Sequence, residues 1–329
     1  MLRTLQAQHD RFALTRPFRI ARGEKSFADV ITVTVSEAGI VGRGEGVPYP
    51  RYGESIEASL AAVESVREAI EAGLDRPALL ALLPPGAARN AIDCALWDLE
   101  ARRSGEDVGT LLGVPAAGPL ASALTIVIDA PGAMAAAAAE AGGAPLLKIK
   151  VDAVRPGERI FAVRAAARDS ALIVDPNESW DRAIVEAMQP ALEEAGVALL
   201  EQPVPAGSDA WLEGFRPSVP ICADESVHVA ADLDTVARRY QAVNVKLDKA
   251  GGLTAAVELA RAARARGLGI MTGCMVSSSL SIAPALHLAA LSDFADLDGP
   301  LWLRDDRQGG VREKGGVLFP PERGFWGSA

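Results

Sequence analysis

The run Leu146-Leu-Lys-Ile-Lys-Val151 decides the fold, because it places two lysines at alternate positions of a short apolar segment. Between residues 121 and 297 such β-type runs alternate with helical patterns, which is typical of βα units in a parallel sheet. The other runs are Ala123–Ile128, Ala171–Val174, Val197–Leu200, Val219–Cys222, Ala242–Leu247, Leu268–Thr272 and Phe294–Leu297. Together they make eight, and eight parallel strands close into a barrel.

The segment Arg304–Ala329, after the last run, is rich in glycine, proline and charged residues and has no 3.6-residue periodicity. We therefore expect no eighth helix. The predicted fold class is α/β, a TIM-like (β/α)7β barrel over residues 119–304 with a tail over residues 305–329.

A different pattern precedes the barrel. Residues 30–47 alternate apolar and polar side chains and predict an antiparallel hairpin, and helical patterns follow at Ser55–Ala72, with Ser55 as N-cap, and at Ala87–Arg103. The turn-rich stretch Gly113–Pro119 marks the end of this α+β module, residues 1–118. The run Gly42-x-Gly44-x-Gly46 follows a hairpin and opens no helix, which argues against a dinucleotide-binding loop.

Composition excludes several classes of function. The chain has 329 residues, 33 Lys and Arg against 43 Asp and Glu, and a net charge of −10, which disfavours nucleic acid and anionic membranes as partners. Three scattered cysteines and the lack of an apolar signal or membrane-spanning segment predict a cytoplasmic protein, either monomeric or homo-oligomeric. With only three histidines, a zinc site or a Ser-His-Asp triad is not expected, so the chemistry rests on Lys, Asp and Glu.

Charged residues end most of the barrel runs. In a βα barrel the carboxyl ends of the strands meet at one mouth, where catalytic groups gather. Successive members of the central set are 22 to 26 residues apart, about one βα repeat, so we expect them at the same mouth. The strand-end residues are Lys148, Lys150, Asp175, Glu201, Asp224, Lys246, Asp296 and Asp298.

Three of these residues, Asp175, Glu201 and Asp224, supply hard carboxylate oxygens from three adjacent strands, a donor set that suits Mg²⁺. The alternative is a salt-bridge network with the lysines. Lys150 and Lys246 stand on either side of the carboxylates and can act as a pair of bases on opposite faces of a substrate. Lys148, on the same strand face as Lys150, and a nearby metal ion would both favour the neutral form of Lys150.

At these positions the chain resembles the muconate-lactonizing subgroup of the enolase superfamily, and within it the dipeptide epimerases. The resemblance covers nearly the whole chain, although Pro176 stands where an Ala is common in the D-x-N motif. The similar segments are Ala21–Gly23, Pro48–Ser55, Ala88–Leu99, Leu147–Lys150, Asp175–Trp180, Glu201–Pro203, Cys222–Ser226, Val243–Asp248, Gly273–Met275 and Asp296–Pro300.

The resemblance implies that residues 1–118 form a capping domain with substrate-covering loops and that the tail returns to it. It implies that Asp296 and Asp298 hold the free ammonium group of a dipeptide and that Arg22 meets a glutamyl side-chain carboxylate. The alternatives without a binding role are an incidental acidic pair at a turn for Asp296 and Asp298, and a solvated basic loop for Arg22. Asn177 and Glu225 are expected to support the ligands.

The implied function is Mg²⁺-dependent epimerisation of L-Ala-D/L-Glu by 1,1-proton transfer, through an enediolate that the metal and Lys148 stabilise, in murein-peptide recycling. Other dipeptides, or a reaction of an N-acylamino-acid racemase, an o-succinylbenzoate synthase or a cycloisomerase, are alternatives. A Schiff-base lyase using Lys150 and a non-catalytic peptide-binding protein are rivals from other classes.

Overall fold

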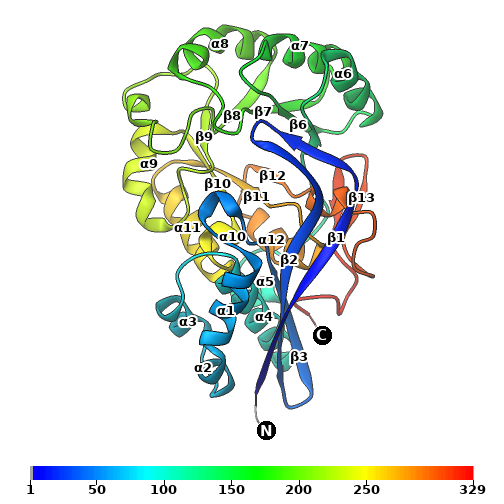
Figure 1. The fold of residues 1–329 in the computed structure, drawn as a ribbon, viewed down its shortest axis with the longest axis vertical. Coiled ribbons are helices and arrows are strands. Elements are labelled where there is room, and N and C mark those ends of the chain that lie inside the picture. Colours follow the sequence, from blue (N-terminus) through cyan, green and yellow to red (C-terminus); the bar gives the residue numbers. More distant parts are fainter. Residues whose placement is uncertain (1–2, 329) are drawn as a thin grey trace.

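Eight parallel strands form one sheet in the computed structural model, which describes residues 3–328. The strands are neighbours in chain order, and the main-chain N–H of Ala123 donates to Ala295 O (2.8 Å), so the first and last strands meet. The predicted barrel is confirmed (Figure 1). Its strands are β5 (Leu124–Ile126), β6 (Leu146–Lys150), β7 (Ala171–Asp175), β8 (Val197–Glu201), β9 (Ile221–Ala223), β10 (Ala242–Lys246), β11 (Gly269–Gly273) and β12 (Phe294–Asp296).

Helices form most of the connections between successive barrel strands. They are α6 (Pro131–Glu140), α7 (Pro156–Ala166), α8 (Arg182–Glu194), α9 (Leu233–Arg239), the short α10 (Leu247–Ala250), α11 (Leu253–Ala265) and α12 (Ser279–Ala289). The connection between β8 and β9 differs from the expected pattern, because it contains only the 3₁₀ turn η2 (Ala210–Leu212). Prolines at 203, 205, 217 and 220 explain this, since proline interrupts helices. After β12, as predicted, no α-helix follows as far as Ser328, and the one helical element there is the 3₁₀ turn η4 (Gly299–Trp302).

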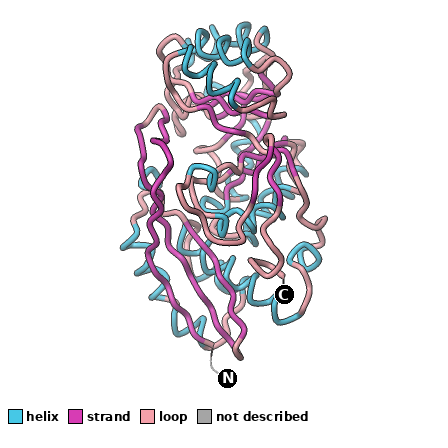
Figure 2. The backbone as a smooth tube through the Cα atoms, turned by 90° about the vertical axis from the view of Figure 1, so that its right-hand side faces the viewer, coloured by secondary structure: helices cyan, strands magenta, loops and turns pink. Residues whose placement is uncertain are grey.

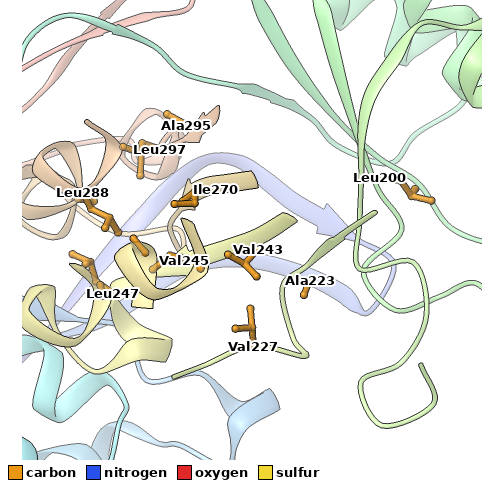
Figure 3. Packing of buried hydrophobic residues seen from close by; sticks show 14 of the residues in the cluster. Leu200, Ala223, Val227, Val243, Val245, Leu247, Ile270, Leu288, Ala295 and Leu297 are labelled. Carbon is orange, nitrogen blue, oxygen red and sulfur yellow. The ribbon is translucent and has the colours of Figure 1, made fainter. Parts of the chain in front are cut away.

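Alternation along each strand separates the helix-facing core from the barrel interior. Leu147 and Ile149 belong to the large apolar core between strands and helices, part of which Figure 3 shows. Leu146 belongs to a smaller apolar layer, contributed by most strands, together with residues such as Ile173 and Leu199. Residues two and four positions later on a strand share its face. Lys148 and Lys150 therefore point into the barrel, above this layer and towards the mouth.

The N-terminal module is an antiparallel sheet of β1 (Thr4–Ile20), β2 (Gly23–Glu37) and β3 (Ile40–Gly46), packed on helices. The predicted hairpin is the second half of β2 with β3, and β1 was not predicted. The long β1–β2 hairpin, blue in Figure 1 and running along one side in Figure 2, reaches the barrel with its tip. The short η1 (Pro50–Tyr52) and the helices α1 (Ile56–Ser65), α2 (Arg67–Glu71), α3 (Arg76–Leu82), α4 (Ala87–Ser104) and α5 (Val108–Leu112) follow.

Ser55 caps α1 as predicted, since its hydroxyl accepts a hydrogen bond from the main-chain N–H of Ala58 (3.1 Å). The single helix predicted for residues 55–72 is divided at Val66 into α1 and α2. The predicted helix at 87–103 corresponds to α4, which is buried along most of its length.

The glycine run of β3 has a packing role. A Cβ atom at Gly44 would lie 2.0 Å from Ala91 O, and one at Gly42 or Gly46 would lie 2.2 Å from a carbonyl oxygen of α4. Only glycine lets the strand backbone approach the helix this closely. The run is thus explained without a nucleotide.

The tail contacts the N-terminal module. Its strands β13 (Arg312–Lys314) and β14 (Val317–Phe319) form a small sheet with β4 (Leu120–Ala121). Arg307 Nη2 lies 2.9 Å from Glu45 Oε2, and Trp326 Nε1 donates to Arg43 O (2.8 Å). Domain boundaries at residues 118 and 304 stay predictions. None of the helices in residues 3–328 has the length and apolarity needed to cross a bilayer.

Candidate active site

A cavity of about 200 Å³ lies at the mouth of the barrel, under the tip of the β1–β2 hairpin and the segment containing η1. Most of the predicted site residues line it, from both the barrel and the N-terminal module. Its lining includes Arg22, Lys25, Tyr49, Tyr52, Lys148, Lys150, Asn177, Asp224, Glu225, Lys246, Asp296 and Asp298. Asp175 and Glu201 are not among its lining residues, but both are fully buried and contact Lys148, which lines it.

The ammonium group of Lys148 is the centre of the buried charges. Its Nζ lies 2.5 Å from Glu201 Oε2, 2.7 Å from Asp296 Oδ2 and 3.2 Å from Asp175 Oδ2. Lys150 Nζ lies 2.5 Å from the same Asp175 oxygen. The salt-bridge network considered from the sequence therefore describes the contacts of this structure.

Two lysines share Asp224. Lys246 Nζ lies 2.8 Å from Oδ2, whereas Lys249 Nζ lies 2.6 Å from Oδ1 and donates to Asn244 O (2.9 Å). Lys249 was not predicted as a site residue, although it follows Lys246 by three residues. Helix α10 starts directly after β10, and its first turn brings the Lys249 side chain back to the site. Because Lys249 pairs with Oδ1, the Oδ2 atom of Asp224 is the one that pairs with Lys246.

These contacts set the charge states. Burial lowers the pKa of Lys148, but the carboxylates of Asp296, Glu201 and Asp175 raise it well above its ordinary value. Burial also lowers the pKa of Lys246, and Asp224 outweighs that effect and raises it. Burial and repulsion from Asp175 raise the pKa of Glu201. Lys148, expected to favour a neutral Lys150, is thus itself held charged.

Whether the carboxylates suit a metal ion depends on their oxygens. In the conformation described for residues 3–328, no three His, Cys, Asp or Glu side chains are close enough together to hold one. Glu201 accepts a hydrogen bond from Asn244 Nδ2 on Oε1 (2.8 Å), while its buried Oε2 accepts none and meets Lys148 only as an ion pair. An acceptor-only oxygen in a set of three hard carboxylates fits Mg²⁺.

Asn177 supports Asp175, as expected. Its main-chain N–H donates to Oδ1 (2.8 Å) and its Nδ2 donates to Oδ2 (3.1 Å) of that carboxylate. Glu225 differs from the expectation of a simple ligand support, because its Oε1 lies 2.6 Å from Nη1 of Arg22.

Arg22 lies in the turn between β1 and β2, at the tip of the hairpin. Besides Glu225, its Nη1 meets Glu178 Oε2 at 2.9 Å and donates to Asn177 O (3.1 Å). The predicted substrate-binding arginine is therefore at the cavity but is paired with two protein carboxylates.

Asp296 and Asp298 both reach the cavity. Asp296 ends β12, whereas Asp298 lies beyond the strand and accepts hydrogen bonds from the main-chain N–H of Thr125 (2.8 Å) and Trp302 Nε1 (3.2 Å). Of these two predicted strand-end residues, only Asp296 therefore lies on β12 itself. Burial, together with Asp296, raises the pKa of Asp298 to about 6.

The segment Pro48–Ser55, one of those that resemble the family, contributes Tyr49 and Tyr52 to the lining. Lys25, from the hairpin, also lines the cavity, and its Nζ lies 4.4 Å from the ring centroid of Tyr49. Lys25 was not predicted as a site residue.

Comparisons with known proteins agree with this geometry. Residues 3–113 match the family model "Mandelate racemase / muconate lactonizing enzyme, N-terminal domain", and residues 132–325 match "Enolase C-terminal domain-like". The L-Ala-D/L-Glu epimerase of Escherichia coli K12 is 48% identical over 93% of this chain and 96% of its own. The N-acetyl-D-glutamate racemase of a Pseudoalteromonas species is 41% identical over 91% and 96%.

Solved structures are similar as well. An enolase family member from Agrobacterium tumefaciens with homology to dipeptide epimerases, with bound sodium and L-Ala-L-Glu, has a TM-score of 0.96 and 47% identity and covers 99% of this chain and 100% of its own. Three dipeptide epimerases, complexed with Mg and a dipeptide, have TM-scores of 0.89 to 0.90 and 26 to 34% identity over 98% of this chain.

Proposed function

This chain belongs to the mandelate racemase / muconate lactonizing enzyme family of the enolase superfamily, and we propose from that premise that it epimerises L-Ala-D/L-Glu and related dipeptides. The observation that carries the proposal is that Lys150 and Lys246 line one cavity from strands that lie on either side of the three strands carrying the carboxylate trio. The 48% identity to an L-Ala-D/L-Glu epimerase supports this substrate class.

Each residue then has a role. Lys150 and Lys246 stand at the ends of β6 and β10, so one can remove the glutamyl α-proton while the other returns a proton to the opposite face. Lys148, held charged by its carboxylate neighbours, stabilises negative charge that develops on the substrate carboxylate in an enediolate.

The proposed metal ligands are Asp175, Glu201 and Asp224, with Asn177 supporting the first of them. Bound Mg²⁺ would supply positive charge to the substrate carboxylate as a Lewis acid. In this structure Lys148 contacts oxygens of Asp175 and Glu201, and Lys150 contacts Asp175, so their ammonium groups balance the proposed ligands and are expected to shift when a cation binds.

Substrate recognition is proposed to use both ends of the dipeptide. Asp296 and Asp298 would bind the free ammonium group, and Arg22 would meet the glutamyl side-chain carboxylate. Murein-peptide recycling, a cytoplasmic location and self-association are further proposals, consistent with a dipeptide substrate but resting on the sequence alone.

Metal removal tests the proposal. Dialysis against EDTA should abolish epimerisation of L-Ala-L-Glu, and Mg²⁺ should restore it, as followed by chiral chromatography. Full activity of the metal-free protein would contradict the assigned ligands.

The second candidate function is racemisation of an N-acylated glutamate, favoured by the 41% identity to an N-acetyl-D-glutamate racemase. The acidic pair distinguishes the two, because an acylated substrate offers no ammonium. For a dipeptide epimerase, N-acetyl-L-Ala-L-Glu should react poorly, and Asp298→Asn should lower kcat/KM for the free dipeptide about tenfold or more. Equal rates for the acetylated and free dipeptides would favour the racemase.

A further inference from the structure

Glu178 is a rim residue of the barrel whose backbone and side chain are both fixed. It lies three residues after the end of β7 and adopts a left-handed backbone conformation (φ 67°), as does its neighbour Asn177 (φ 47°). Residues other than glycine adopt this region only where surrounding contacts enforce it. Here the main-chain N–H of Glu178 donates to Gln202 O (2.9 Å), and its Oε1 accepts from the main-chain N–H of Ala206 (2.8 Å). The next barrel loop therefore holds the carboxylate in place.

Two arginines from the N-terminal module meet this carboxylate. Arg51, in η1, donates from Nε to Oε2 (2.9 Å) and from Nη2 to Oε1 (2.8 Å), which is the two-pronged geometry preferred between arginine and a carboxylate. Arg22, at the hairpin tip, approaches Oε2 at 2.9 Å. The Glu178 side chain is only 6% exposed, whereas the Arg51 side chain is 40% exposed, so a buried carboxylate pairs with arginines that reach it from the surface.

Arg22 contacts the barrel through one nitrogen of its guanidinium group. Its contacts with Glu178, Asn177 and Glu225 all use Nη1. The guanidinium nevertheless lines the cavity. Nη1 is thus anchored to the barrel, and Tyr49 is a further side-chain hydrogen-bond partner of Arg22, so the guanidinium is held in a fixed orientation at the cavity.

We propose that Glu178 is a positioning residue that joins both substrate-covering segments to the barrel through Arg22 and Arg51 and thereby orients Arg22 towards an acidic substrate side chain. The inference rests on the proposed dipeptide epimerisation and extends it to the selection of a side-chain carboxylate. Arg51 acts indirectly, by fixing the carboxylate that fixes Arg22.

The variant Glu178→Gln tests this, because glutamine can still accept from Ala206 N–H but lacks the charge for the two arginines. The KM for L-Ala-L-Glu should rise about tenfold, the loss expected for one charge-assisted hydrogen bond, with a smaller change in kcat. The KM for the neutral L-Ala-L-Ala should change less than about threefold. Cleavage by trypsin within the hairpin tip should become faster.

The matched control is Glu186→Gln, which removes the carboxylate of an exposed ion pair with Arg182 on α8, outside the barrel mouth. It should leave both KM values and the trypsin rate unchanged. Arg51→Met should reproduce part of the Glu178→Gln effect, and the double variant should be no worse than Glu178→Gln alone. Melting temperatures show whether every variant is folded.

The outcomes are distinct. Equal losses for acidic and neutral dipeptides, additive effects of the two substitutions, or wild-type behaviour of Glu178→Gln would each overturn the positioning role. If the wild-type enzyme epimerises no dipeptide, the proposed function fails, and the substrate part of this inference fails with it. An unchanged trypsin rate in the variant would then refute the joining of the loops as well.

Discussion

Lys150 and Lys246 are both buried beside carboxylates, yet they reach the cavity from strands separated by β7, β8 and β9. At the scale of single residues, the proposal of two bases depends on this separation. Lys150→Ala and Lys246→Ala should each reduce epimerisation at least about a hundredfold, because general acid–base catalysis contributes that much or more.

The two variants should differ in which epimer still exchanges its α-proton with D₂O, since each retains the lysine for one face. ¹H NMR of L-Ala-L-Glu and L-Ala-D-Glu, incubated separately, measures this. Wild-type epimerisation by Lys246→Ala would disprove the two-base scheme.

The charged strand ends could be predicted at residue scale, because each closes an apolar run and the runs repeat. Their partners could not. Lys249, Arg51 and Glu178 carry no pattern that separates them from surface charges, and their contacts depend on the path of loops between distant segments. The contacts of Glu178 with Arg51 and Arg22 join residues that are 127 and 156 positions apart in the chain.

At the scale of elements, the contact between β3 and α4 holds the N-terminal module together. Gly44→Ala should lower the free energy of unfolding by about 1 to 3 kcal/mol, because the added Cβ would lie 2.0 Å from Ala91 O and would force the elements apart. Urea denaturation measures the change. Gly132→Ala is the control, since nothing lies within 4 Å of a Cβ there. Equal stability of the two variants would contradict the packing role.

The contact of α10 with the N-terminal module gives a pH-dependent prediction. Asp248 Oδ1 accepts from the main-chain N–H of Val47 and from Asn90 Nδ2, both at 2.8 Å, and burial raises its pKa from 3.8 to about 7. The folded state therefore binds this proton more tightly than the unfolded state. The resulting stabilisation is fully present below about pH 4 and is lost as the pH rises towards about 7.

Asp248→Asn keeps the accepting oxygen and removes the titration. Relative to wild type, the variant should become progressively more stable between pH 4 and pH 8, by up to roughly 1.4 kcal/mol per pH unit within the window. Denaturation curves at four pH values measure the difference. A constant difference across this range would show that Asp248 does not titrate there.

The elements themselves were only partly predictable. The barrel strands are apolar on both faces below the mouth, so their runs are easily recognised. Strand β1 was missed because only a few of its residues, such as Leu5 and Leu14, are buried, and because a register shift between Ala13 and Phe18 breaks the alternation. It is a strand because β2 pairs with it.

At the scale of the whole molecule, the cavity exists only where the two modules meet. The barrel supplies the charged floor and the N-terminal module supplies the hairpin tip and the tyrosines above it. The tail adds a third connection, since Arg307 reaches both Asp10 and Glu45 across the sheet. Sequence patterns predict much of the fold of each module separately, whereas the relative placement of the two modules depends on packing between residues far apart in the chain.

The central claim is tested most directly by incubating the Mg²⁺-loaded protein with L-Ala-L-Glu in D₂O and following the glutamyl α-carbon by NMR and chiral chromatography. The account predicts that L-Ala-D-Glu is formed with one solvent deuterium at that carbon, while the alanyl α-proton is retained. Failure to form L-Ala-D-Glu, or its formation with the original α-proton kept, would contradict epimerisation by Lys150 and Lys246.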